Sequence, residues 1–186
     1  MKKIWMQKHL QMKTIIWRYM PLDKYIDLLY RKELFLCRLD KLEDPQEGSW
    51  TKQEIDKSPW PEDAIQEFKE WSFINCWHLN KVESAAMWEL YSSKNAGIAI
   101  KTTIGKLKNS LKEDSKRLHI GKVNYVDNYI DDLEYSLPQD SNRLTMLGPV
   151  FKKRKSFLHE NRSASCLLDY RTSSALLRKS GLRKID

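Results

Sequence analysis

The feature that most constrains the fold is a repeated change of hydrophobic period along the chain. Runs rich in β-branched and aromatic residues, such as TIIWRYM at 14–20 and AGIAIKTT at 96–103, are typical of strands. Between them lie segments with apolar residues at helical spacing, such as PLDKYIDLLYRK at 21–32. None of the strand-like runs is a long Val/Ile/Leu stretch of the kind found in parallel sheets. The sequence therefore predicts an α+β fold, a single domain with a mixed or mainly antiparallel sheet and several helices.

The same patterns predict the individual elements. Strands are expected at 14–20, 33–39, 72–79, 96–103 and 118–126. Helices are expected at 21–32, 59–71, 80–93 and 104–114, and Asn80 followed by Glu83 resembles a capping box. The segment 40–49 is expected to be a loop, 155–160 is either a last strand or a helix start, and 127–142 is left unassigned.

The charge is unevenly distributed. Of the formal net charge of +8, residues 151–186 carry +7, with ten Lys and Arg against three acidic residues. We expect one domain over 1–160, followed by a basic tail at 161–186, rich in Ser, Arg and Leu and poorly ordered. Contact with nucleic acid, if any, would then belong to the end of the chain.

Cysteine and hydropathy patterns limit the class of protein. Cys37, Cys76 and Cys166 are far apart and form no CxxC pair, which argues against a disulfide framework or a zinc site. Neither a signal peptide nor a membrane span is indicated. We expect a cytoplasmic protein without a bound metal.

Arg18 is the first candidate for a functional side chain. It lies in a predicted strand that is apolar on both faces, where burial of a guanidinium is costly unless it is paired. Either it forms a salt bridge with Glu47, Glu83 or Glu89, or it faces a ligand cleft.

The segment SFINCWHL at 72–79 supplies the second group of candidates. Strand alternation places Cys76 and His78 on one face. They could form a thiolate–imidazole pair or part of a metal site, or Cys76 could be a small core residue and His78 a residue at the pocket edge. Trp77 in this segment, with Met87, Trp88 and Tyr91 downstream, fits a core as well as a site.

Three further segments carry charge. EDPQEG at 43–48, which contains Glu47, is either a loop that covers a ligand or an Asp-Pro turn. The run KKRK at 152–155 either contacts phosphates or is solvated. Glu160 faces a cleft or ends an exposed strand. The four members of the basic run are Lys152, Lys153, Arg154 and Lys155.

The order of several motifs resembles a bacterial family. IIWRYM, LFLCRLDKLEDPQEG, NCWHLN, MWELYS, GIAIK, GKVNYVD and FKKRKSFLHE occur in the order typical of the DUF2971-like family of domains of unknown function. The resemblance covers about residues 17–160. Members of that family usually continue with a second acid and an Arg after the residue that matches Glu160, whereas Asn161 and Arg162 follow here. We hypothesise that the chain leaves the family pattern at Asn161, as a frameshift or truncation would cause.

Two function classes remain open. An Arg on an early strand, a polar residue on a middle strand and a late Glu are similar in layout to the ADP-ribosyltransferase fold. That analogy implies NAD as a substrate, with Glu160 and His78 as catalytic residues. The ligand-binding set would be Arg18, Tyr19, Glu47, Trp88 and Tyr91. The alternative is a non-enzymatic module that binds nucleotide or nucleic acid, as an accessory protein associated with defence.

Overall fold

The structure is a computed structural model, and it describes residues 5–6, 10–56, 58, 62–92, 96–111, 118–126 and 145–160. The segment 127–142, the tail expected at 161–186 and Cys166 lie outside the described residues. Within the described part, no helix is long and apolar enough to cross a membrane.

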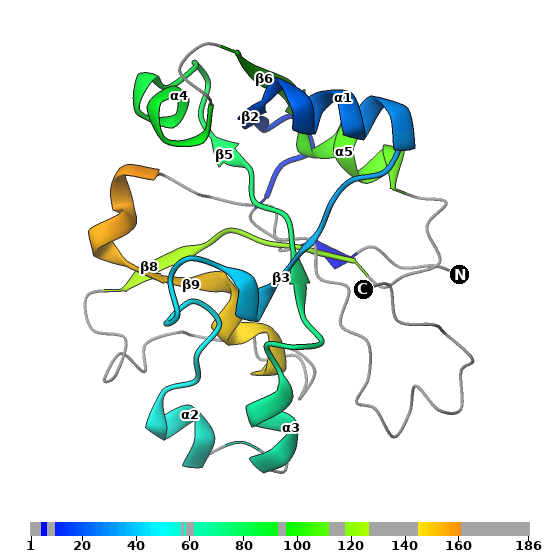
Figure 1. Ribbon diagram of the computed structural model, residues 1–186. Coiled ribbons are helices and arrows are strands. Elements are labelled where there is room, and N and C mark those ends of the chain that lie inside the picture. Colours follow the sequence, from blue (N-terminus) through cyan, green and yellow to red (C-terminus); the bar gives the residue numbers. More distant parts are fainter. Residues whose placement is uncertain are drawn as a thin grey trace.

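Helices and short strands alternate along the chain (Figure 1). The strands are β1 (Trp5–Met6), β2 (Ile15–Pro21), β3 (Cys37–Arg38), β4 (Phe73–Ile74), β5 (His78–Leu79), β6 (Gly97–Thr103), β7 (His119–Ile120), β8 (Asn124–Val126) and β9 (Lys152–Arg154). The α-helices are α1 (Leu22–Arg31), α2 (Lys52–Asp56), α3 (Glu62–Glu67), α4 (Ala85–Tyr91) and α5 (Ile104–Ser110). The 3₁₀ helices are η1 (Leu39–Lys41), η2 (Thr145–Phe151) and η3 (Lys155–Glu160).

The main sheet has the strand order β5-β2-β6 and is antiparallel throughout. Seven residues of β2 pair with seven of β6, from Ile15 opposite Thr103 to Pro21 opposite Gly97. The remaining strands form two-stranded pairs: β3-β4 is antiparallel, whereas β1-β7 and β8-β9 are parallel. The predicted α+β fold, with a mixed or mainly antiparallel sheet, is confirmed, and its main sheet is antiparallel.

Two of the predicted continuous strands are interrupted. The segment 72–79 forms β4, which pairs with β3, and then β5, which pairs with β2. The segment 118–126 likewise forms β7 and β8, which belong to different pairs. Strand alternation therefore does not hold across 75–77, and the expectation that Cys76 and His78 share one strand face is wrong. Each segment is apolar enough to form a strand, but its two halves pair with strands of different sheets.

The interruptions follow from the existence of two cores. The first core packs around β2 and α5, and the second packs around η1, β4 and η2. The first core contains Leu10, Ile16, Trp77, Ile104, Leu107, Leu118 and Ile120. The second core contains Leu39, Phe68, Ile74, Val123, Leu147, Val150 and Phe151. Figure 1 shows α1, α4 and α5 around the β5-β2-β6 sheet at one end and α2, α3, β8 and β9 toward the other. Segments 72–79 and 118–126 run between the two ends and contribute to both cores.

The helices differ from prediction in their ends and in the faces they bury. The apolar stripe of α1 faces outward: Ile26 and Leu29 are more than half exposed, and Tyr30 is 87% exposed. The N-cap of α4 is Ser84, whose Oγ accepts from the Met87 N–H, so the capping box predicted at Asn80 is wrong. α5 buries Ile104, Gly105 and Leu107. The predicted strand at 33–39 is reduced to β3, and 155–160 is the 3₁₀ helix η3.

Candidate functional site

A cavity of about 650 Å³ lies along β2, α1 and the connection between β4 and β5. It falls where the chain passes from one core to the other, so its walls come from both. Its lining includes residues 17–21 of β2, the 74–78 connection and two residues of α4, Met87 and Tyr91. A volume of this size is within the range of ligand cavities in proteins.

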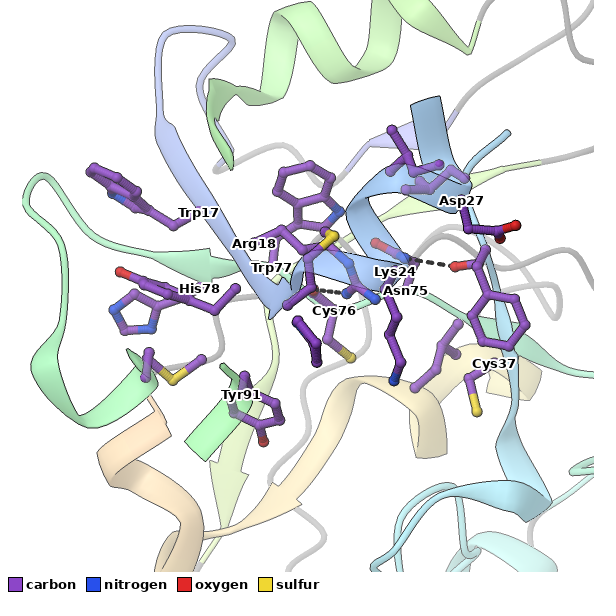
Figure 2. A pocket seen from close by; sticks show the side chains of 18 of the residues that line it. Trp17, Arg18, Lys24, Asp27, Cys37, Asn75, Cys76, Trp77, His78 and Tyr91 are labelled. Carbon is purple, nitrogen blue, oxygen red and sulfur yellow. Dashed lines mark hydrogen bonds between the residues drawn. The ribbon is translucent and has the colours of Figure 1, made fainter. Parts of the chain in front are cut away.

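Arg18 crosses the middle of this cavity wall (Figure 2). Its guanidinium Nη1 donates to the carbonyl oxygen of Cys76 at 2.5 Å. Cys76 lies in the interruption between β4 and β5, where a strand ladder no longer pairs the backbone. A hydrogen bond to a charged group contributes about 1.5–3 kcal/mol, so Arg18 stabilises the interruption as well as lining the cavity. Arg18 thus occupies a position in the cavity wall, one of its two expected environments.

His78 is 2% exposed and lines the cavity near its Tyr91 end. Its Nδ1 lies 2.7 Å from the backbone carbonyl oxygen of Glu160. A carbonyl only accepts, so Nδ1 is the donor in this hydrogen bond. The contact joins β5 to the end of η3, two segments 82 residues apart in sequence.

The carboxylate of Glu160 is held behind the cavity. Its Oε1 accepts a hydrogen bond from the Tyr91 hydroxyl at 2.8 Å, and its Oε2 lies 2.9 Å from Lys153 Nζ. Lys153 Nζ also lies 3.3 Å from Glu47 Oε2, and all three charged side chains are at most 7% exposed. Glu47, Lys153, Glu160 and Tyr91 thus form one buried chain of charged and polar groups. Its last member, Tyr91, lines the cavity.

Aromatic rings form the wall next to His78. The ring of Tyr19 packs edge-on against His78, with centroids 6.1 Å apart, and against Trp88, with centroids 5.3 Å apart. The Tyr19 hydroxyl accepts from the Ser84 N–H at 2.9 Å, and burial raises the pKa of this tyrosine. Trp88 donates from Nε1 to Glu83 Oε2 and supports Tyr19 from outside the cavity.

The far end of the cavity carries a mixture of charges and a thiol. Four carboxylates and Lys24 belong to the lining there and along α1, and Asp27 also pairs with Arg31 at 2.6 Å. Cys37 lines the same end (Figure 2), and burial raises the pKa of its thiol, with Cys76 as a smaller contribution. A raised pKa keeps the thiol protonated near neutral pH and disfavours a nucleophilic role. The lining carboxylates are Asp23, Asp27, Glu33 and Glu43.

The basic run at 152–155 is not a continuous surface patch. Lys152 is 1% exposed and donates to both carboxylate oxygens of Glu54 at 2.6 Å, and Lys153 is buried in the chain described above. Arg154 donates to Asp44 Oδ1 at 3.1 Å. The expectation that Lys152 and Lys153 are solvated is therefore wrong, because both side chains are buried against carboxylates. Phosphate contact through these two residues stays a prediction that their burial does not favour. Arg154 and Lys155 remain at the surface.

The structure brings together part of the predicted site. Arg18, Tyr19, His78 and Tyr91 line the cavity, whereas Glu47, Trp88 and Glu160 do not occur among the described residues that line it. Glu160 does not line this cavity and is not at an exposed strand end, because it ends η3 and is buried. Sequence reasoning missed Asn75, and it named Lys153 without foreseeing that its ammonium is buried. A polar Asn in the apolar run 72–79 was an available signal, but nothing in KKRK indicated a buried lysine.

No cluster of His, Cys, Asp and Glu able to hold a metal ion occurs among the residues that the structure describes. Comparison of the chain with protein-family models, curated proteins and solved structures gives no match. The resemblance to the DUF2971-like family therefore rests on its motifs and stays a prediction.

Proposed function

We propose that the cavity binds a dinucleotide of the NAD class and that the protein transfers or hydrolyses ADP-ribose. The observation that supports this proposal is the convergence of Arg18, His78 and Tyr91 on one cavity, with Glu160 bonded to Tyr91. A guanidinium is suited to bidentate binding of a pyrophosphate, and aromatic rings suit the nucleoside ends. The mixed charge of the lining differs from the uniformly basic groove that follows a nucleic acid backbone.

The proposed reaction breaks the bond between the ribose carbon and the nicotinamide nitrogen. The electron pair of that bond leaves with the ring, which departs as neutral nicotinamide. The acceptor, water or a nucleophilic oxygen or nitrogen of a second substrate, forms the new bond to the ribose carbon and releases a proton to solvent. Positive charge develops on the sugar in the transition state, and a nearby carboxylate stabilises such charge.

Glu160 acts in this proposal as a positioning residue. Its carboxylate fixes the Tyr91 hydroxyl at the cavity wall, and its backbone carbonyl fixes the His78 ring. Tyr91 is the group of this set that reaches the ribose. The ion pair with Lys153 neutralises part of the Glu160 charge. The contribution of that charge to the transition state is accordingly smaller than that of a free carboxylate.

Binding is tested by calorimetric titration of NAD into the purified chain. We expect Arg18→Ala to weaken binding about tenfold or more, because a charge-assisted hydrogen bond contributes about 1.5–3 kcal/mol. Arg38→Ala is the matched control, since Arg38 pairs with Asp40 at 2.6 Å and does not line the cavity. Binding should persist in high salt, unlike contact between a basic surface and phosphate. A folded chain that does not bind NAD would contradict the proposal.

Turnover is tested by measuring nicotinamide release from NAD. We expect Tyr91→Phe and Glu160→Gln to lower kcat about tenfold or more with little change in KM, because both act on the transition state rather than on binding. Tyr25→Phe and Glu89→Gln are matched controls, since neither residue lines the cavity. Release that is unchanged in both site variants would remove the assigned roles, even if NAD binds.

A further inference from the structure

Among the described residues, three side chains in the cavity wall carry a buried polar atom without a hydrogen-bond partner: Asn75, Trp77 and His78. Asn75 and His78 are each 2% exposed, and both line the cavity. Asn75 Oδ1 and His78 Nε2 have no hydrogen-bond partner within the part of the chain that the structure describes. Trp77 Nε1 is the third such atom in the lining, and it is an N–H donor, whereas Trp50, Trp71 and Ser72 carry such atoms but do not line the cavity. A buried polar atom left unpaired costs about 1–3 kcal/mol, so a partner supplied by a ligand is favoured.

The neighbouring contacts decide what kind of partner each atom needs. Asn75 Nδ2 donates to the carbonyl oxygen of Phe35 at 2.7 Å. Because that carbonyl only accepts, the amide is oriented with Oδ1 as the unpartnered acceptor. The carbonyl of Glu160 likewise requires a proton on His78 Nδ1, so Nε2 of the neutral ring carries a lone pair. Asn75 Oδ1 and His78 Nε2 are therefore both acceptors, and each calls for a donor.

The two acceptors lie apart along the cavity. Figure 2 places His78 toward the Tyr91 end and Asn75 on the side of Lys24 and Cys37, with Arg18 between them. A ligand that satisfies both must extend past the guanidinium and present an N–H or O–H group at each end. A carboxylate or ring carbonyl at either position would instead face a lone pair in a buried setting, which is unfavourable.

We propose that the cavity selects a dinucleotide with an N–H donor at each end, one for His78 Nε2 and one for Asn75 Oδ1. This inference rests on the proposed function and names the groups recognised. In the NAD class the donors are the carboxamide NH₂ of nicotinamide and the exocyclic amino group of adenine. The carboxamide lies at His78, next to Tyr91 and the sugar bond that breaks, and the adenine amino group lies at Asn75.

The experiment compares NAD with its two deaminated analogues by calorimetric titration. Nicotinic acid adenine dinucleotide replaces the carboxamide by a carboxylate, and nicotinamide hypoxanthine dinucleotide replaces the adenine amino group by a carbonyl. We expect each analogue to bind about tenfold to a hundredfold more weakly than NAD, the range that corresponds to one buried acceptor left unpaired. The wild-type protein alone gives this result, so the test does not depend on any variant folding.

Two variants assign each preference to one residue. His78→Leu should abolish the preference for the carboxamide and keep the preference for adenine, and Asn75→Leu should do the reverse. Each variant is thus the control for the other. An exchange of the two patterns would support the two acceptors with the dinucleotide reversed. Equal binding of NAD and both analogues would overturn the inference while leaving the proposed function intact. Absence of binding by all three dinucleotides would overturn both.

Discussion

At the scale of single residues, function here depends on side chains whose environment the sequence does not reveal. Arg18 is both a cavity residue and the partner of the Cys76 carbonyl, so its role as a candidate ligand group and its role in the fold are combined. Lys153 is the clearest case. It stands in a run of four basic residues, yet it is 3% exposed and lies between two carboxylates.

The Lys153 ion pairs give a prediction about stability. Lys153→Met removes the ammonium and leaves the carboxylates of Glu47 and Glu160 buried together without it. Breaking a buried ion pair by removing one partner costs about 3–5 kcal/mol, and we expect a loss of this size in the free energy of unfolding measured in urea. Lys155→Met is the control, since Lys155 is exposed and should change stability by less than about 0.5 kcal/mol. Equal effects of the two substitutions would contradict the buried position of Lys153.

At the scale of elements, the predicted and observed strands differ where one continuous apolar segment leaves one sheet and enters another. β2 and β6 pair over seven residues each, and both were predicted within one residue, because their apolar and β-branched runs serve one sheet. The runs at 72–79 and 118–126 have similar composition but divide between two sheets. Hydrophobic pattern measures burial, and a segment that is buried against two cores looks the same as one long strand.

The helix α1 shows a related limit. Its helical period was read correctly from 21–32, but no residue of α1 is buried. The period of apolar residues predicts that one face is apolar, not what covers that face. The side of α1 that faces the cavity includes Asp23, Lys24 and Leu28, which belong to its lining. The apolar side, with Ile26 and Leu29, faces away from the cavity lining.

At the scale of the whole molecule, the two cores are linked by the segments that run between them. Ile74 belongs to the second core and Trp77 to the first, three residues apart. Ile120 and Val123 show the same division. Loss of packing in one core therefore disturbs the segments 72–79 and 118–126, which also pack in the other core. The cavity lies where the two cores meet.

This linkage predicts a single cooperative unfolding transition. Ile16→Ala in the first core and Leu147→Ala in the second should each lower the free energy of unfolding by about 2–5 kcal/mol, because both side chains are at most 3% exposed. Tryptophan fluorescence and far-ultraviolet circular dichroism should report one shared midpoint for each variant. Separate midpoints, with each variant shifting only one of them, would show that the two cores unfold independently.

The sequence by itself determined the α+β class and identified β2 and β6 as strands. It also indicated Arg18, Tyr19, His78 and Tyr91 as candidate site residues. These features follow from the local period of hydrophobic residues, and from the fact that a charged or polar residue stands out in an apolar run. Only the tertiary structure decided that 72–79 changes sheets and that Glu160 stands behind Tyr91. It also decided that Lys153 is an interior residue and that Asn75 and His78 present acceptors to the cavity. These depend on contacts between segments that lie 40 to 110 residues apart, such as Asn75 with Phe35 and Arg154 with Asp44, and no local pattern encodes them.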